Sequence, residues 1–403
     1  MNLPVEDVAP LFTPLDIRGV TLPNRIAVSP LCMYSAEHGL AQPWHFAHLS
    51  TFARGKAGLV FTEATAVEAR GRITPKCLGI WTDEQAAALE PITEFIRSMG
   101  CVPGIQLAHA GRKASTRPPF VARPGQPLTE DDTDLGEGPW DTVAPSAEPV
   151  GPNWHCPREM TAADLATVKT AFADAALRSV NCGFSVIELH MAHGYLLHSF
   201  LSPLGNHRQD EYGGSLENRM RFPLEVCAAV RKVIPDSMPL FTRISAIDGP
   251  EGGWTLEDSI VFSKKMAAVG IDVVDCSSGG IAGAPRFRSD DSGKPLTRSS
   301  AREPGFQVPF TERIGKETSV KTMAVGVIVD PHQANEIIKA GRADLVALGR
   351  EIMHDPFWPL HAAQALEQDP DFNMWPAQYA WAVDRRAQIQ QLNRSQRDDN
   401  GEA

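Results

Sequence analysis

Two histidines and a tyrosine lie close together in the stretch ELHMAHGY, and all three side chains can take part in proton chemistry. The imidazoles of His190 and His193 can donate hydrogen bonds, and the phenol of Tyr195 can deliver a proton. The preceding run Phe184–Leu189 is short, apolar and entered through a glycine, which is typical of a buried strand. Gly194 gives the backbone room to turn after it. The spacing therefore predicts that the three side chains gather at one strand end, on a scaffold that brings a cofactor to face them.

A metal site is the alternative interpretation of the histidine pair. Zinc would need a third protein ligand, and Glu188 has the same strand parity as His190. The seven cysteines include no Cys-x-x-Cys spacing, which argues against a zinc ribbon, a thioredoxin motif and an iron–sulfur cluster. We therefore expect no metal, and we interpret the cysteines as thiols of a cytoplasmic protein.

Composition restricts the possible partners of the chain. A net charge of -11 argues against nucleic acid and against anionic membranes. No apolar stretch approaches the length of about 18 residues that a transmembrane helix needs. The N-terminal residues MNLPVEDVAP have neither the basic nor the apolar region of a signal peptide. These features favour a cytoplasmic protein with small-molecule ligands.

Eight short apolar runs must position the candidate residues, and helical patterns lie between most of them. Thr161, Ser215 and Thr255 begin three of the helices, and Asp330 precedes a fourth that starts with proline. Eight strands that alternate with helices predict an α/β fold, a single (β/α)8 TIM barrel. An open doubly wound sheet is the alternative, but no G-x-G-x-x-G follows the first strand. The runs are Arg25–Pro30, Ala57–Glu63, Val102–Leu107, Phe184–Leu189, Pro239–Ile244, Ile271–Cys276, Lys321–Gly326 and Ala343–Leu348.

The remaining segments are expected to surround one barrel that spans residues 1–383. Residues 8–24 precede the first strand and should cap the bottom of the barrel. Two polar insertions, 115–146 and 279–305, each follow a strand and should lie at the C-terminal face, where barrels keep their active sites. Residues 384–403 form a polar tail that should fray.

Polar residues collect at the ends of successive strands, as a ligand site at the top of a barrel requires. Gly326, Gly349 and Arg350 follow the last two strands, where glycine backbone and an arginine could hold a phosphate. Arg243 lies inside an apolar run and needs an anionic partner, either a protein carboxylate or a cofactor ring that carries negative charge. Gln106 offers a donor and an acceptor to a planar heterocycle, or a hydrogen bond within the barrel.

Several longer motifs resemble the old yellow enzyme family. The cysteine in the first strand end is similar to that of its "thermophilic-like" branch of ene-reductases and xenobiotic reductases. The resemblance covers roughly residues 9–383. The motifs are Leu11–Pro14, Pro23–Ile26, Ser29–Tyr34, Gln106–Lys113, His193–Leu196, Phe200–Pro203, Asn206–Arg208 and Asp210–Ser215.

The resemblance implies a barrel that holds one non-covalent FMN and reduces electron-poor alkenes with NAD(P)H. In such a ping-pong reaction NAD(P)H passes a hydride to flavin N5, and the alkene then takes the hydride at its β-carbon. His190 and His193 would bind the carbonyl or nitro oxygen of the alkene, Tyr195 would protonate its α-carbon, and Tyr34 would anchor it. Cys32 would tune the flavin potential. The residues implied to hold FMN are Ser29, Pro30, Leu31, Cys32, Ala64, Gln106, Arg243, Gly326, Gly349 and Arg350.

Two departures from the family pattern affect what the resemblance implies about recognition. Related proteins often place an arginine near the C-terminus that reaches a neighbouring subunit, whereas this chain has Trp381 there, a residue that would stack on a substrate. We expect a homodimer or homotetramer in which Trp381 crosses over. The insertion 279–305 is also longer than usual. A reductase of bulky or CoA-linked substrates, and a flavin-binding barrel without alkene turnover, remain alternatives.

Overall fold

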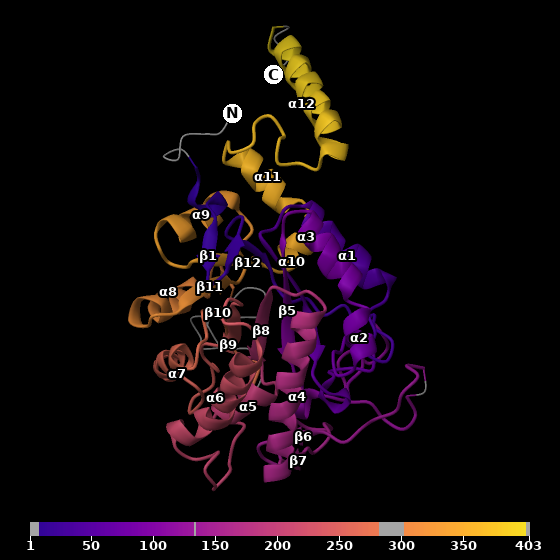
Figure 1. The fold of residues 1–403 in the computed structure, drawn as a ribbon, viewed down its shortest axis with the longest axis vertical. Coiled ribbons are helices and arrows are strands. Elements are labelled where there is room, and N and C mark those ends of the chain that lie inside the picture. Colours follow the sequence, from indigo (N-terminus) through magenta and orange to yellow (C-terminus); the bar gives the residue numbers. More distant parts are fainter. Residues whose placement is uncertain (1–7, 133, 282–301, 400–403) are drawn as a thin grey trace, which may run out of the picture.

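A computed structural model describes residues 8–132, 134–281 and 302–399 of the chain. Eight parallel strands form a closed barrel in the order β3, β4, β5, β8, β9, β10, β11, β12, with β12 pairing back to β3 (Figure 1). Each strand matches one of the eight predicted apolar runs, so the (β/α)8 prediction is confirmed. The barrel strands are β3 (Ile26–Val28), β4 (Leu59–Ala66), β5 (Val102–Ala108), β8 (Val186–Met191), β9 (Leu240–Ser245), β10 (Val273–Ser277), β11 (Lys321–Val325) and β12 (Leu345–Leu348).

Helices cover the outside of the barrel and begin at the predicted caps. The side chains of Thr161, Ser215 and Thr255 each accept a backbone N–H at a helix start, as does Asp330 before the helix that opens with Pro331. The helices are α1 (Pro43–Arg54), α2 (Asp83–Ala87), α3 (Glu90–Ser98), α4 (Ala162–Asn181), α5 (Leu196–Leu201), α6 (Leu216–Val233), α7 (Leu256–Ala268), α8 (Val308–Glu317), α9 (Pro331–Lys339), α10 (Arg350–His354), α11 (Trp358–Ala365) and α12 (Ala377–Asp399), with 3-10 turns at Pro10–Phe12, Ala69–Gly71 and Gly111–Lys113.

An antiparallel hairpin lies at the N-terminal ends of the barrel strands. It consists of β1 (Leu15–Ile17) and β2 (Val20–Leu22). Its buried residues Leu15, Ile17 and Leu22 share one apolar cluster with residues from the barrel interior, among them Phe61 and Phe241. Apolar packing therefore fills this end of the barrel, and polar chemistry is left to the other end.

Strand β8 runs two residues further than the sequence pattern suggests. The predicted strand ended at Leu189, but β8 continues through His190 to Met191, and all of its residues are buried. The cause is the register with β9, in which His190 pairs with Arg243 and Met191 pairs with Ile244. His190 is therefore part of the barrel wall, where the ladder with β9 holds it, whereas His193 and Tyr195 follow the strand.

The two insertions differ in how much of each is described. Between residues 115 and 146 the chain is held by ion pairs of Arg117 with Asp132 and Asp134, and it ends in β6 (Val143–Ala144), which pairs with β7 (Arg158–Glu159). Of the insertion 279–305, residues 282–301 lie outside the described residues.

The C-terminal segment differs from its prediction. Residues 384–403 were expected to fray, but α12 is helical through Asp399 and projects beyond the barrel (Figure 1). Its start is held against the body because Arg54 donates a hydrogen bond of 2.7 Å to the hydroxyl of Tyr379. In the described part of the chain, no helix is long and apolar enough to cross a membrane.

Candidate active site

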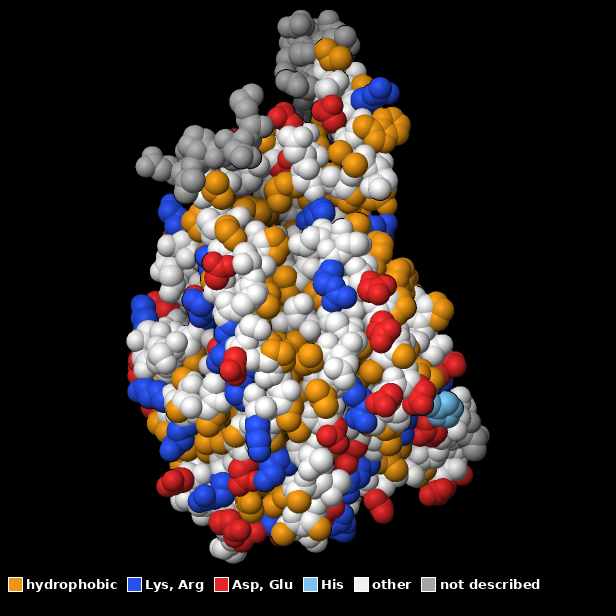
Figure 2. All heavy atoms as spheres, in the orientation of Figure 1, with side chains coloured by type: hydrophobic (Ala, Val, Ile, Leu, Met, Phe, Trp, Pro, Cys, Tyr) orange, Lys and Arg blue, Asp and Glu red, His pale blue; other side chains and the backbone are white. Residues whose placement is uncertain are grey.

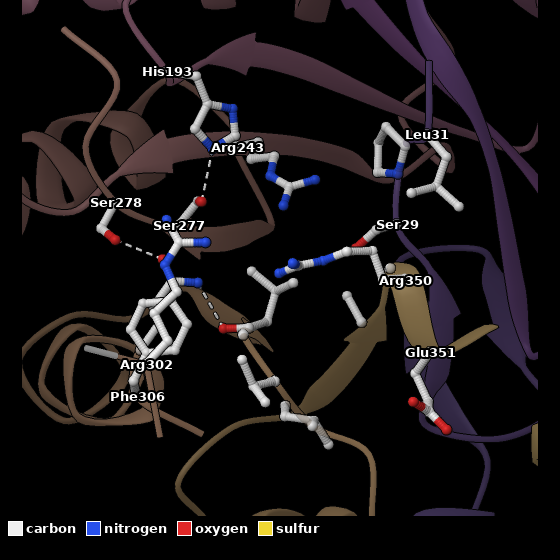
Figure 3. A pocket seen from close by; sticks show the side chains of 18 of the residues that line it. Ser29, Leu31, His193, Arg243, Ser277, Ser278, Arg302, Phe306, Arg350 and Glu351 are labelled. Atoms are coloured by element: carbon white, nitrogen blue, oxygen red, sulfur yellow. Dashed lines mark hydrogen bonds between the residues drawn. The ribbon is translucent and has the colours of Figure 1, made fainter. Parts of the chain in front are cut away.

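A cavity of about 740 Å³ lies at the C-terminal ends of the barrel strands (Figure 3). Its wall is built from the ends of β3, β9, β10, β11 and β12 and from the turn after β8. This volume is within the range of about 300–1,000 Å³ found for small-molecule sites. The predicted site residues on its wall are Ser29, Pro30, Leu31, His193, Tyr195, Arg243, Gly326, Gly349 and Arg350.

The other predicted residues lie behind this wall or away from it. Ala64 lines a second, very small cavity together with Tyr195. Gln106 is buried and donates to Glu188 Oε1 at 2.8 Å. Cys32 and Tyr34 lie near each other, beside the cavity end of β3. Trp381 is 62% exposed on α12, outside the cavity of its own chain.

His190 is placed by strand β8 and oriented by its own backbone. Its Nδ1 accepts the N–H of Ala192 at 3.3 Å, so the ring proton is assigned to Nε2. The ring lies edge-on to those of His193 and Tyr195, with centroids 5.2 Å and 5.0 Å apart. Burial, and next the charge of Arg243, lowers the pKa of His190 well below its ordinary value. His190 is therefore a neutral donor at physiological pH.

His193 follows the strand in a left-handed conformation, with φ 62°. Its Nε2 lies 2.7 Å from the hydroxyl of Ser277, at the end of β10. If that hydroxyl donates, the ring proton is on Nδ1 and is available to a ligand. Burial, followed by the charge of Arg243, lowers the pKa of His193 as well. His193 thus lines the cavity, whereas His190 is not among the lining residues and packs against the rings of His193 and Tyr195.

The turn after β8 packs directly against the turn after β10. A Cβ added to Gly194 would lie 2.4 Å from the carbonyl oxygen of Gly280, and a Cβ added to Gly280 would lie 2.5 Å from Cα of His193. Lys113 Nζ donates to the carbonyl oxygens of both His193, at 2.7 Å, and Gly280. Only glycine fits at this contact, and the lysine fastens the two turns together.

The two tyrosines and the cysteine are all held in their protonated forms. Burial raises the pKa of Tyr195 and that of Tyr34 above their ordinary values. Burial, and next the charge of Glu63, raises the pKa of Cys32 well above that of a free thiol. Cys32 is consequently a thiol and not a nucleophilic thiolate, while Tyr195 keeps its proton until a strong base is next to it.

A layer of buried charged residues lies at the base of the cavity. Arg243 points into the cavity (Figure 3), and its Nε lies 3.2 Å from Oδ2 of Asp275 on the neighbouring strand. Burial raises the pKa of Asp275 to about 6, and burial together with the charge of Asp275 raises that of Glu188 well above its usual range. Arg243 was expected to pair with either a protein carboxylate or a negatively charged cofactor ring. It has the carboxylate of Asp275 as a partner, and its guanidinium also faces the cavity.

The opposite side of the cavity has the features of an anion site. Gly326, with φ 127°, and Gly349 leave the backbone accessible there, and the Arg350 guanidinium extends toward the middle of the cavity (Figure 3). Ser29 Oγ is buried, and among the described residues it has no hydrogen-bond partner. A bound molecule with polar groups would supply one.

Sequence reasoning missed the side chains that support the histidines. Ser245 and Ser277 directly follow two predicted strands, and Lys113 is the last residue of the motif Gln106–Lys113, but none was given a role, and His198 was given none either. Polar residues at strand ends were the available signal for the two serines. Among the described residues, no group of three or more His, Cys, Asp or Glu side chains is placed to hold a metal ion.

Comparisons with known proteins give one consistent result. Residues 10–369 match the sequence profile of the NADH:flavin oxidoreductase / NADH oxidase family. The chain is 44% identical over 358 residues to the NADPH dehydrogenase of Geobacillus sp. (strain WCH70), which covers 88% of this chain and 94% of that protein. It is 42% identical over 361 residues to the NADPH dehydrogenase of Bacillus subtilis (strain 168), covering 89% and 96%.

Solved structures show the same barrel. Morphinone reductase in complex with tetrahydroNAD superposes with a TM-score of 0.70 at 24% identity, over 88% of this chain and 91% of that one. Histamine dehydrogenase from Rhizobium sp. 4-9 gives a TM-score of 0.71 at 27% identity, over 89% of this chain but 48% of that longer one.

Proposed function

Because the chain belongs to the NADH:flavin oxidoreductase / NADH oxidase family, the old yellow enzymes, we propose that it reduces the activated C=C bond of α,β-unsaturated carbonyl or nitro compounds. FMN and NAD(P)H are the cofactors of this oxidoreductase. The observation that carries the proposal is the grouping of three side chains at the end of β8. His193 and Tyr195 line the cavity, and the ring of His190 packs against both, with centroids 5.2 Å and 5.0 Å away. Two hydrogen-bond donors and one acid are what the reduction of a polarised alkene requires.

The residues on the cavity wall fit FMN. Arg350, Gly326 and Gly349 would hold its phosphate, and Ser29 Oγ, buried without a partner among the described residues, would gain one. Arg243 would face negative charge on the ring, which its place between Asp275 and the cavity supports. When bound, FMN supplies the two-electron carrier that accepts a hydride from NAD(P)H and gives it to the alkene.

His190 and His193 would bind the carbonyl or nitro oxygen of the substrate. Hydride addition to the β-carbon places negative charge on that oxygen, so donors aimed at it stabilise the transition state more than the ground state. Both imidazoles are neutral, because burial lowers their pKa values. They therefore act as hydrogen-bond donors without giving up a proton.

Tyr195 would give its proton to the α-carbon. Its raised pKa keeps the phenol protonated while the site waits for substrate, and the carbon that receives the proton is basic enough to take it. Lys113 Nζ lies 5.7 Å from the centre of the Tyr195 ring, and its positive charge would stabilise the phenolate that remains. Tyr34 and Cys32, both protonated, would contact the substrate beside it.

Anaerobic reoxidation tests this function directly. The NAD(P)H-reduced protein is mixed with 2-cyclohexenone, and the return of oxidised flavin absorbance is followed. We expect reoxidation by the unsaturated ketone and none by cyclohexanone, which has the same oxygen but no alkene. If no activated alkene reoxidises the flavin, the protein is a flavin-binding barrel with another role.

We also propose that the chain forms a homodimer or homotetramer in which Trp381 approaches the cavity of a neighbouring subunit. Trp381 and Ile389 are 62% and 58% exposed on α12, and apolar side chains are visible on this projection (Figure 2). Large exposed aromatic and aliphatic side chains on a projecting helix favour burial against another chain. A second copy would also supply the aromatic contact to substrate.

A further inference from the structure

In the turn after β8, the backbone N–H and C=O groups of both His193 and Gly194 bond to side chains. Both residues are left-handed, with φ 62° and 74°, a conformation that costs energy for histidine and persists only when its surroundings enforce it. The four bonds are His193 N–H to Ser245 Oγ (2.9 Å), Lys113 Nζ to His193 O (2.7 Å), Gly194 N–H to His198 Nδ1 (2.8 Å) and Ser199 Oγ to Gly194 O (3.1 Å).

His198 differs from the other three partners because its role depends on a tautomer. Its Nδ1 can accept the Gly194 N–H only when that nitrogen carries no proton, so the neutral ring must be protonated at Nε2. Nε2 lies 2.9 Å from Oδ1 of Asp248, and both side chains are 0% exposed. A buried carboxylate facing Nε2 selects the tautomer that the turn requires.

Asp248 is itself fixed in orientation. Its Oδ2 accepts the hydroxyl of Ser202 at 2.6 Å and the N–H of Trp254 at 2.7 Å, which leaves Oδ1 toward His198. Burial alone would raise the pKa of Asp248, but the interaction with His198 and the hydrogen bonds from Ser202 and Trp254 lower it below the ordinary value. The carboxylate is thus anionic, with Oδ2 held by two hydrogen bonds and Oδ1 in close contact with His198 Nε2.

We propose that His198 is a positioning residue of the reaction, and that Asp248 selects its tautomer so that it holds the Gly194 N–H and keeps His193 and Tyr195 in place beside the cavity. The effect of the turn on alkene reduction rests on the proposed function. The hydrogen bond between the Gly194 N–H and His198 does not depend on it. Gly194 lies directly between His193 and Tyr195, so a shift of its peptide moves both side chains that line the cavity.

The same arrangement occurs at two other places in the barrel. His45 accepts the N–H of Gln42 at 3.0 Å and faces Glu63, and His109 accepts the N–H of Gly111 at 3.0 Å and faces Glu68. By contrast, among the described residues no carboxylate lies within 4.0 Å of His190. His190 also accepts a backbone N–H, that of Ala192, but it does so without a carboxylate at its other nitrogen.

Asp248→Asn tests the tautomer. The amide oxygen should stay with Ser202 and Trp254, which donate, so its NH2 group would face Nε2 of His198. The ring would then need its proton on Nδ1, opposite the Gly194 N–H, and the bond to the turn would be lost. His198→Asn is the conservative rescue, since its amide oxygen can accept the Gly194 N–H without help from residue 248, whereas His198→Leu cannot.

Two measurements distinguish the hydrogen bond between Gly194 and His198 from its effect on alkene reduction. Hydrogen exchange followed by mass spectrometry reads protection of the peptide that contains Gly194, and stopped-flow kinetics read the two half-reactions. We expect D248N and H198L to lose protection and to slow alkene reduction by about tenfold or more, the size expected for one buried hydrogen bond, while reduction by NAD(P)H is unchanged. H198N and the double variant H198N/D248N should stay close to wild type in both measurements.

Asp355→Asn provides the matched control, because Asp355 pairs with His361 at 2.7 Å on the protein surface. It should change neither measurement. The inference is overturned if D248N keeps protection and alkene rate, or if D248N has the same effect in the H198N background as in wild type. If the exchange pattern is as expected but wild type reduces no alkene, the bond stands and the proposed function fails.

Discussion

The imidazole of His190 stands edge-on to the phenol of Tyr195, with ring centroids 5.0 Å apart and ring planes at 75°. His190 belongs to strand β8, whereas Tyr195 follows the turn, so the barrel wall places one of the two hydrogen-bond donors and the turn places the acid. The two functions can therefore be removed one at a time.

Tyr195→Phe should slow alkene reduction by about 10²–10⁴-fold, the usual contribution of a general acid. The phenylalanine keeps the ring contact with His190 and loses only the hydroxyl. Reduction of the flavin by NAD(P)H needs no proton from this residue and should be unchanged. Anaerobic stopped-flow measurement of each half-reaction checks this, and equal losses in both would count against the proton-donor role.

His190→Ala should weaken the binding of phenols, whose phenolate resembles the anionic oxygen of the reacting substrate. Loss of one hydrogen bond to a charged group corresponds to about 10–100-fold in Kd. Titration of the oxidised protein with a panel of phenols, followed by the long-wavelength absorbance, measures it. His332→Ala, on the exposed side of α9, is the control and should bind phenols normally. Unchanged affinity in His190→Ala would argue against the oxyanion pocket.

Arg350→Met should lower the affinity for FMN by about 10–100-fold, because a charge-assisted contact to phosphate is lost while the length of the side chain is kept. Fluorescence of flavin released on dilution gives the Kd. Arg313→Met removes an arginine from surface ion pairs with Glu257 and Glu317 and should retain FMN like wild type. Equal retention by both variants would place the phosphate elsewhere.

Asp275→Asn should change how stability depends on pH. The pKa of Asp275 is raised from 3.8 to about 6, so the folded protein holds this proton more tightly than the unfolded chain does. That contribution to stability is present below about pH 4 and is lost as the pH rises through 6. Relative to wild type, the FMN-free variant should therefore gain stability between pH 4 and pH 8.

Denaturant unfolding of the FMN-free proteins at several pH values measures this difference. The ion pair with Arg243 exists only when Asp275 is ionised, and its effect is already contained in the net rise of the pKa of Asp275. Glu188 shares the buried layer, and Glu188→Gln is the companion variant, because its side chain keeps an acceptor for Gln106. Parallel stability curves for wild type and Asp275→Asn would mean that Asp275 does not titrate in this range.

Ile389→Glu should reduce the molar mass measured in solution by light scattering, because it places a charge on the exposed apolar face of α12. Gln390→Glu adds the same charge at the next position and should leave the mass unchanged. Trp381→Ala should weaken alkene binding in the oligomeric protein but not in the Ile389→Glu background, where the oligomer is lost. A wild-type monomer with full activity would refute the proposal that Trp381 crosses over.

The barrel was predictable because its signals are local. Eight apolar runs and the caps at Thr161, Ser215, Thr255 and Asp330 each follow from a few neighbouring residues. Where pairing with a distant strand decides, the pattern failed, and His190 belongs to β8 because of its register with Arg243. A helix through Asp399 was also missed, because a polar segment gives no hydrophobic period to detect.

The candidate site was predictable in its main residues and not in their supports. His193, Tyr195, Arg243 and Arg350 line one cavity, as their places after separate strands suggested. His198 and Asp248 are 50 positions apart in the sequence, and the residues around each of them do not predict that the two side chains pair. Such contacts come from tertiary packing, which one sequence does not display.

The hairpin β1–β2 determines from which end of the barrel ligands can reach the cavity. Leu15, Ile17 and Leu22 fill the barrel from below, so a nicotinamide donor, an alkene and a saturated product would all have to pass through the same mouth. Each ligand must then dissociate before the next can bind. The saturated ketone should consequently slow turnover by competing with NAD(P)H, so product inhibition at this shared entrance, and not the chemistry alone, would limit the rate at high product concentration.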